Sequence, residues 1–183
     1  MNSLKSRLVT DVSIYAKPIM EIIRDLQSQP MLDEKQLGVI LRRHSRNHNG
    51  VFSKNLIIRT YRYLCDSGEL QPDPKLIQRL RMKPTRTISG VAPVTVLTKP
   101  YPCPGKCIFC PTDARMPKSY LSDEPGAMRA EQHKFDPFDQ TDARIATFRD
   151  NGHEVDKIEL LILGGTWSSY PGDYQEWFVK RCF

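Results

Sequence analysis

The sequence predicts an α/β protein in which a basic helical region precedes a βαβ unit. Apolar residues recur at helical spacing through the first half of the chain. The second half holds two apolar, strand-like segments, 91–98 and 156–163, with helical sequence between them. We expect the change to fall at the linker Pro84-Thr85-Arg86, which gives a helical region over 1–84 and an α/β region over 85–183.

Four segments of the first region have helical periodicity. Pro18 lies early enough in the first of them to occupy an initial turn or to split the segment. Asp33 and Ser53 are plausible N-caps of the second and third. The four expected helices are 11–29, 33–46, 53–65 and 74–81.

The second region has the order strand, loop, helices, strand, Gly-rich turn, helix. The fully apolar end of the second strand favours a buried parallel strand. A right-handed crossover would place the carboxyl ends of both strands on one edge. Because two strands do not complete a parallel sheet, we expect the N-terminal piece of a longer protein. The expected helices are 124–134, 138–151 and 173–181.

The net positive charge is confined to the first half. The formal net charge of +6 divides into +8 over residues 1–90 and −2 over 91–183, and no acid lies between Glu34 and Asp66. Phe52, Tyr61 and Tyr63 alternate with the basic residues there. This pattern predicts a nucleic-acid contact, although a solvated basic helix face fits the charges equally well. The candidate contacts are Lys35, Arg42, Arg43, Arg46, Lys54, Arg59 and Arg62.

The chain lacks the sequence features of a membrane or secreted protein. No apolar run approaches the roughly 20 residues of a membrane helix, and the start has no signal-peptide pattern. Five cysteines, an odd number, argue against a disulfide scaffold. We therefore expect a cytoplasmic protein.

Cys103, Cys107 and Cys110 form a C-x3-C-x2-C motif. Structural zinc takes four ligands, and no fourth is evident. Three thiolates suit a 4Fe-4S cluster with one open iron, which S-adenosylmethionine can chelate before reductive cleavage to a 5′-deoxyadenosyl radical. Phe109 would then offer an apolar face to adenine, or simply pack within the loop. Zinc and free thiols are the alternatives, and Cys65 and Cys182 are expected to be packing thiols.

Gly164-Gly165-Thr166 directly follows the second strand. Glycines there permit close approach of the backbone to a ligand, here the methionine amino group of the same cofactor. The alternative is a turn that ends the strand.

Those motifs resemble the radical S-adenosylmethionine superfamily, and further segments resemble the Elongator protein 3 family more closely. The resemblance is specific over 86–183 and looser over 1–85. Many family members have a longer gap between the first two cysteines. The segments that carry the resemblance to the Elongator protein 3 family are Arg86–Ala92, Cys107–Pro111, Ser119-Tyr120, Glu124-Pro125, Met128–Ala130, Asp136–Phe138, Gly152–Lys157 and Leu163–Trp167.

The resemblance implies a basic tRNA-binding region followed by the first βαβ part of a radical S-adenosylmethionine partial (β/α) barrel. It implies an enzyme that attaches a carboxymethyl group, drawn from acetyl-CoA, to the wobble uridine of tRNA. The cluster, S-adenosylmethionine and acetyl-CoA would be its cofactors and co-substrate. Its partners would be tRNA and either other Elongator-type subunits or further copies of itself.

The acetyltransferase domain and most of the barrel are absent, so we expect no complete reaction from this piece, and we assign no catalytic residue. One alternative is a non-catalytic nucleic-acid-binding module with a structural metal. Another is a radical S-adenosylmethionine enzyme with a different substrate.

Overall fold

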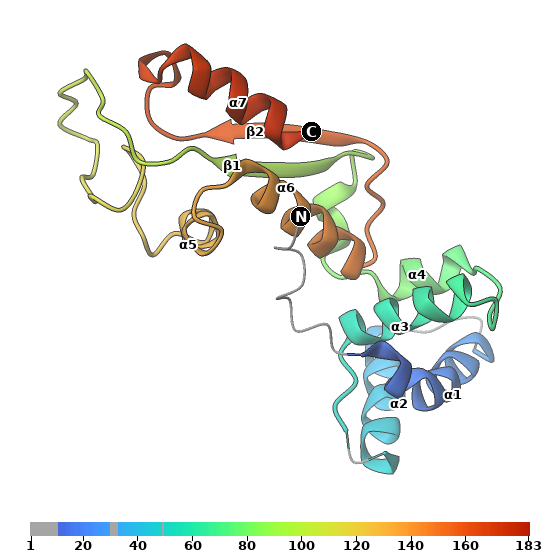
Figure 1. Cartoon of the computed structure of the whole chain (residues 1–183). Helices are drawn as coiled ribbons and strands as arrows, with labels where there is room; N and C mark the ends of the chain where they lie inside the picture. The colour runs from blue at the N-terminus through green and yellow to red at the C-terminus, as the bar shows by residue number, and fades with distance from the viewer. Residues whose placement is uncertain (1–10, 30–32, 49) are drawn as a thin grey trace. The chain divides into compact units, whose positions relative to one another are not determined.

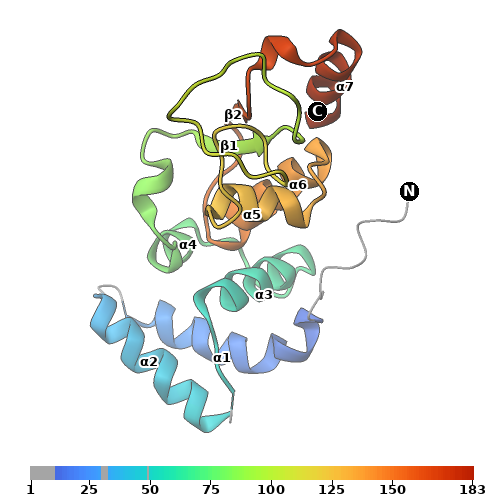
Figure 2. The same ribbon diagram turned by 90° about the vertical axis from the view of Figure 1, so that its left-hand side faces the viewer.

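The computed structural model describes residues 11–29, 33–48 and 50–183. The chain divides into two compact units. The first comprises Met1–Pro84 with Asp150–His153, and the second comprises Thr85–Arg149 with Glu154–Phe183. Figures 1 and 2 show the helical unit and the unit that contains the two strands. No helix in the described part is long and apolar enough to cross a membrane.

The first unit is built from short helices with strong N-terminal caps. Asp33 caps α2 in a capping box with Gln36, and Ser53 caps α3, as the sequence predicts. Pro18 lies in the first turn of α1, after a turn of 3-10 helix at Val12–Tyr15. The helices are α1 (Ala16–Gln27), α2 (Glu34–Asn47), α3 (Lys54–Asp66) and α4 (Pro74–Leu80).

These helices enclose one apolar core. Helix α1 contacts both α2 and α3, and its buried residues lie at helical spacing. Cys65 packs against the edge of the core, as expected for a packing thiol. The linker predicted at Pro84-Thr85-Arg86 forms a turn of 3-10 helix, η2 (Pro84–Thr87). The core includes Ile19, Ile22, Ile23, Leu26, Ile57, Ile58, Leu64 and Leu80.

The second unit contains a parallel pair of strands, β1 (Ala92–Leu97) and β2 (Ile158–Leu163). Leu97 lies opposite Leu163 in the register, so both strands end at the same edge. Figure 1 shows the loops that follow β1 and β2 leaving the strands at that end. The helices of this unit are α5 (Pro125–Gln132), α6 (Pro137–Asp150) and α7 (Gly172–Cys182), with a 3-10 turn, η3 (Trp167–Ser169), before α7.

Helices cover one face of the strand pair. Val94 and Val96 share a core with Phe178 and Cys182 of α7, and Ile145 of α6 packs against it. Burial raises the pKa of the Cys182 thiol, which suits a packing role. In Figure 1, α6 and α7 run beside the paired strands.

The other face of β2 carries exposed apolar side chains, Leu161 and Leu163. The sequence predicts a buried strand, and the structure differs because β1 is the only strand that pairs with β2 among the described residues. The side chain of Gln140, on α6, bonds the backbone of Leu97 at the end of β1 as a neighbouring strand would. Its side-chain oxygen accepts from the Leu97 N–H at 2.8 Å, and its amide donates to the Leu97 carbonyl at 2.9 Å.

Candidate functional site

The cysteine loop and the Gly-Gly-Thr turn meet at the carboxyl edge of the strands. The Sγ atom of Cys103 lies 3.2 Å from the Oγ1 atom of Thr166. These residues are 63 positions apart, and the parallel register of β1 and β2 brings them together. The sequence predicts that the two motifs share an edge, and this contact confirms it.

Cys103 has the environment of a stabilised thiolate. The hydroxyl of Thr166 lowers the pKa of the thiol most, followed by the backbone N–H of Gly105, and the positive charge of Lys118 adds to the effect. Hydrogen bonds and nearby positive charge favour the charged form of a cysteine, which is the form that binds metals. Cys103 is therefore prepared to act as a ligand.

The other two cysteines lie on the same loop with different surroundings. A Cβ at Gly105 would lie 3.5 Å from the Cys103 Sγ and 3.6 Å from the Cys107 Sγ, so the bare glycine lies between two sulfurs. The Cys110 Sγ lies 3.1 Å from the Oγ of Ser119. Ser119 has a φ of 81°, a left-handed conformation that is uncommon outside glycine.

Gly164 is required by the packing of the site. Its φ is 155°, and a Cβ there would lie 1.9 Å from the Oγ1 of Thr98, which is closer than atoms can approach. Gly165 lies beside Lys118, with its Cβ position 3.5 Å from the Lys118 Cβ. The turn thus combines an obligatory glycine with a threonine that contacts Cys103.

Tyr170 fixes the start of both loops. Its hydroxyl donates to the Lys99 carbonyl at 2.9 Å and lies 2.8 Å from the Oγ1 of Thr98. Its ring stacks on Tyr101 and Tyr174, with centroids 4.9 and 5.1 Å away. These contacts hold the chain that leads into the cysteine loop.

A cavity of about 380 Å³ adjoins Cys103, and its lining includes Tyr101, Gly105 and Lys118. The side chain of Phe109 is 91% exposed. The alternative in which Phe109 simply packs within the loop is therefore not what the structure shows. The exposed ring is available to a ligand.

The basic residues of the first unit separate into two groups. Arg43 pairs with Asp25, Lys54 with Glu34 at 3.6 Å, and Arg59 with Asp150 at 3.9 Å. Within the described ranges no acid pairs with the remaining four. These are Lys35, Arg42, Arg46 and Arg62.

The aromatic residues among these basic positions are mostly structural. Phe52 and Tyr61 are buried in the helical core, and burial raises the pKa of Tyr61 to about 12. Tyr63 is exposed, so its ring is accessible for stacking. The sequence pattern does not distinguish these three rings, because their burial depends on how α3 packs.

Sequence reasoning missed several residues that shape the site. Thr98, Lys118, Ser119 and Tyr170 all contact the cysteines or the glycine turn. Thr98 carried a usable signal, since it follows β1 directly at the edge where ligands bind parallel sheets. The others lie in irregular segments whose path the sequence does not show.

Comparison with known proteins finds similarity to curated tRNA uridine(34) acetyltransferases and to Elongator complex protein 3. The chain is 52% identical over 113 residues to a tRNA uridine(34) acetyltransferase of Methanocaldococcus infernus and 48% identical over 101 residues to one of Dehalococcoides mccartyi. It is 39% identical over 117 residues to the human Elongator complex protein 3. No family model matches the chain.

These matches confirm the resemblance that the motifs predict. They cover 58%, 55% and 58% of this chain but only 21%, 22% and 21% of the three relatives. The chain thus spans about a fifth of the length of the curated relatives it matches. Over the matched segment the chain is similar to tRNA uridine(34) acetyltransferases and to Elongator complex protein 3.

Proposed function

We propose that this chain supplies the cluster-binding and tRNA-binding portion of a radical S-adenosylmethionine enzyme that modifies the wobble uridine of tRNA. The contact between Cys103 and Thr166 carries the proposal, because it joins the cysteine loop to the Gly-Gly-Thr turn. The relatives named tRNA uridine(34) acetyltransferases support tRNA as the substrate and acetyl transfer as part of the reaction.

The residues fit a 4Fe-4S cluster with three protein ligands. Cys103, Cys107 and Cys110 would hold it, because they share one exposed loop and Cys103 favours the thiolate. When bound, the cluster and S-adenosylmethionine supply one-electron reductive cleavage of a carbon–sulfur bond. Ser119 would orient the Cys110 sulfur and Thr166 would orient that of Cys103.

The neighbouring groups would bind and shield S-adenosylmethionine. Gly164 and Gly165 form the turn at the strand edge, where their backbone groups would meet the methionine amino group, and Thr166 adds a hydroxyl there. The exposed ring of Phe109 would stack on adenine and exclude water from that side. We propose that β1 and β2 begin the partial barrel, with the exposed Leu161 and Leu163 on its interior face.

The helical unit would contact the tRNA backbone. Lys35, Arg42, Arg46 and Arg62 are the strongest candidates because no described acid pairs with them. Arg43, Lys54 and Arg59 remain candidates that would first have to exchange their carboxylate partners. Acetyl-CoA and other Elongator-type subunits, or a second copy, would bind the full-length protein, and we assign no residue of this chain to them.

Anaerobic reconstitution with iron and sulfide tests the cluster. The chain should become brown and hold about four iron atoms, whereas C107S should lose the colour. C65S is the matched control, because Cys65 packs against the helical core, and it should reconstitute like the parent. A colourless protein that holds stoichiometric zinc on the three loop cysteines would contradict the proposal.

Cluster formation and tRNA binding, measured on the same reconstituted protein, distinguish this proposal from the two alternatives. A non-catalytic nucleic-acid-binding module with a structural metal would bind tRNA and form no cluster. An enzyme with another substrate would form the cluster but bind tRNA weakly and without salt dependence. The proposed function requires both the cluster and salt-sensitive tRNA binding.

A further inference from the structure

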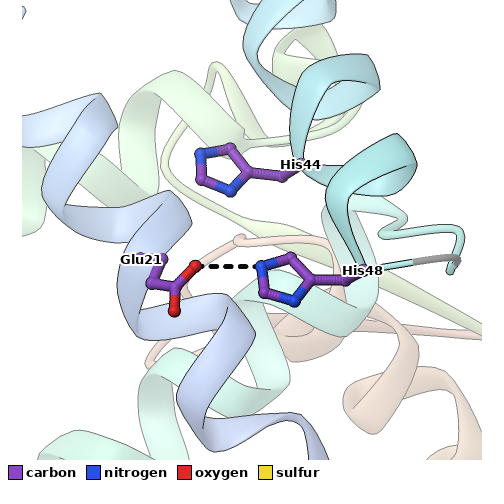
Figure 3. A group of neighbouring side chains, drawn as sticks. All are labelled: Glu21, His44 and His48. Atoms are coloured by element: carbon purple, nitrogen blue, oxygen red, sulfur yellow. Dashed lines mark hydrogen bonds and ion pairs between the residues drawn. The ribbon is translucent and has the colours of Figure 1, made fainter.

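Two helices of the first unit present facing pairs of metal-ligating side chains. His44 lies in the last turn of α2, and His48 is the C-cap residue that directly follows the helix. Their rings stack with centroids 6.2 Å apart, so both lie at the same end of α2. Glu21 and Asp25 are four residues apart on α1. Figure 3 shows the rings of His44 and His48 turned toward the Glu21 carboxylate. We infer that Glu21, His44 and His48 form a site for a divalent transition-metal ion.

The distances suit such an ion. One potential ligand atom from each of the three residues lies within 4.8 Å of the others. The Nε2 of His48 is already 2.9 Å from the Oε2 of Glu21. Two ligands that share a tetrahedral zinc ion at ordinary bond lengths lie about 3.4 Å apart. Small changes of side-chain torsion would therefore close the site.

The hydrogen bonding of His44 adds independent support. Its Nε2 lies 2.7 Å from the Oδ2 of Asp25, while its Nδ1 is buried and has no partner. A neutral ring that donates from Nε2 keeps a lone pair on Nδ1. An unpaired buried acceptor is costly, and a bound ion would satisfy it. A carboxylate on the other ring nitrogen is the usual setting of a metal-binding histidine.

The local charge also favours a cation. With neutral histidines, the carboxylates of Glu21 and Asp25 carry two negative charges, and Arg43, which pairs with Asp25, offsets one of them. Two imidazoles and one carboxylate are typical ligands of zinc. His48 lies at the exposed side, where water can complete the coordination. This site is distinct from the cysteine loop, which lies in the second unit.

The ion would join α1 to α2. Because α2 carries Lys35, Arg42 and Arg46, fixing this helix would also fix the basic surface proposed for tRNA. The inference itself does not depend on the proposed function, since it rests on residues of the first unit alone.

Zinc titration by calorimetry tests the site, in a full-length chain with C103S, C107S and C110S so that loop thiols do not capture the metal. We expect one zinc ion per chain and a higher melting temperature with zinc. H48Q and E21Q should each weaken binding at least about tenfold, and D25N about 10- to 100-fold. His44 is left unchanged in these variants, because its ring is buried and replacing it would disturb the packing around it.

H133A is the matched control, because His133 lies in the other unit and should leave zinc binding unchanged. Bound cobalt should show nitrogen and oxygen ligation, without a thiolate charge-transfer band. Zinc affinity equal in the parent and H48Q, or no uptake by the parent, would overturn the inference and indicate a simple Glu21–His48 ion pair.

Discussion

At the scale of single residues, the hydroxyl of Thr166 stabilises the thiolate form of Cys103. It is the largest of the influences that lower the pKa of this thiol. In T166V the hydrogen bond is lost, so we expect the pKa to rise and alkylation of Cys103 in the cluster-free protein to require a higher pH. T166S keeps a hydroxyl and should behave like the parent.

Mass spectrometry of iodoacetamide-treated protein, taken over a pH series, measures this for each cysteine. Cys107 serves as an internal reference, because the hydroxyl that T166V removes contacts the sulfur of Cys103. If T166V leaves the pH profile of Cys103 unaltered, Thr166 does not tune the thiol.

Gly164 is the residue at which steric exclusion is strongest. G164A would place a Cβ 1.9 Å from the Oγ1 of Thr98 at a φ of 155°. We expect a loss of about 3 kcal/mol or more in the free energy of unfolding, from overpacking and backbone strain together. Urea denaturation followed by circular dichroism measures it.

The matched control is G172A, at the first residue of α7, where nothing lies within 4 Å of the added Cβ. It should be neutral or slightly stabilising, because alanine favours helix. Equal stability of the two variants would mean that the Gly164 turn relaxes without cost.

At the scale of elements, the sequence predicts most of the helices correctly, but it wrongly predicts that the second strand is buried. Asp33 and Ser53 are recognisable caps because capping is a local interaction. The exposure of Leu161 depends instead on which strands lie beside β2, and its own segment carries no such information.

The candidate site divides in the same way. The cysteine spacing and the Gly-Gly-Thr turn are local patterns. Because parallel strands end at the same edge, the sequence also predicts that the two motifs share this edge, where Cys103 contacts Thr166. The approach of Ser119 to Cys110 and the pairing of Arg59 with Asp150 depend on the path of irregular segments and on tertiary packing. Neither can be read from spacing.

Helix α4 offers a test of capping through pH. The carboxylate of Asp73 accepts from the backbone N–H groups of Lys75 and Leu76 and from Gln27. Burial raises the pKa of Asp73, but these hydrogen bonds outweigh it and leave the pKa below its usual value. The charged form therefore stabilises the fold above the unfolded pKa of about 3.9, and this contribution is lost as the pH falls through the folded-state pKa.

We expect D73A to cost about 1 kcal/mol at neutral pH and D73N to cost less, because asparagine also caps helices. The stability difference between the parent and D73N should shrink in acid, when Asp73 is protonated in both states. Urea unfolding at neutral and acidic pH measures both. A difference that is independent of pH would show that the Asp73 charge does not contribute.

At the scale of the whole molecule, the residues proposed to bind a polyanion lie in the basic helical unit, and those proposed to bind a cluster lie in the α/β unit. The full chain has a net charge of +6, but a protein binds nucleic acid through cations that are free to meet phosphates. Arg42 and Arg46 have no described acidic partner, whereas Lys54 and Arg59 each pair with one. The location of free charge, rather than net charge, should therefore govern tRNA affinity.

Two double variants with the same change in net charge test this. R42A/R46A should weaken tRNA binding and lower the slope of log affinity against log salt by about two, since each lost phosphate contact removes about one. K54A/R59A should change the slope less, because these cations already pair with acids. Fluorescence anisotropy over a salt series measures both, with melting curves to confirm folding. Equal losses of affinity in the two variants would show that tRNA responds only to net charge. The assignment of the contact to the basic residues without a described acidic partner would then be wrong.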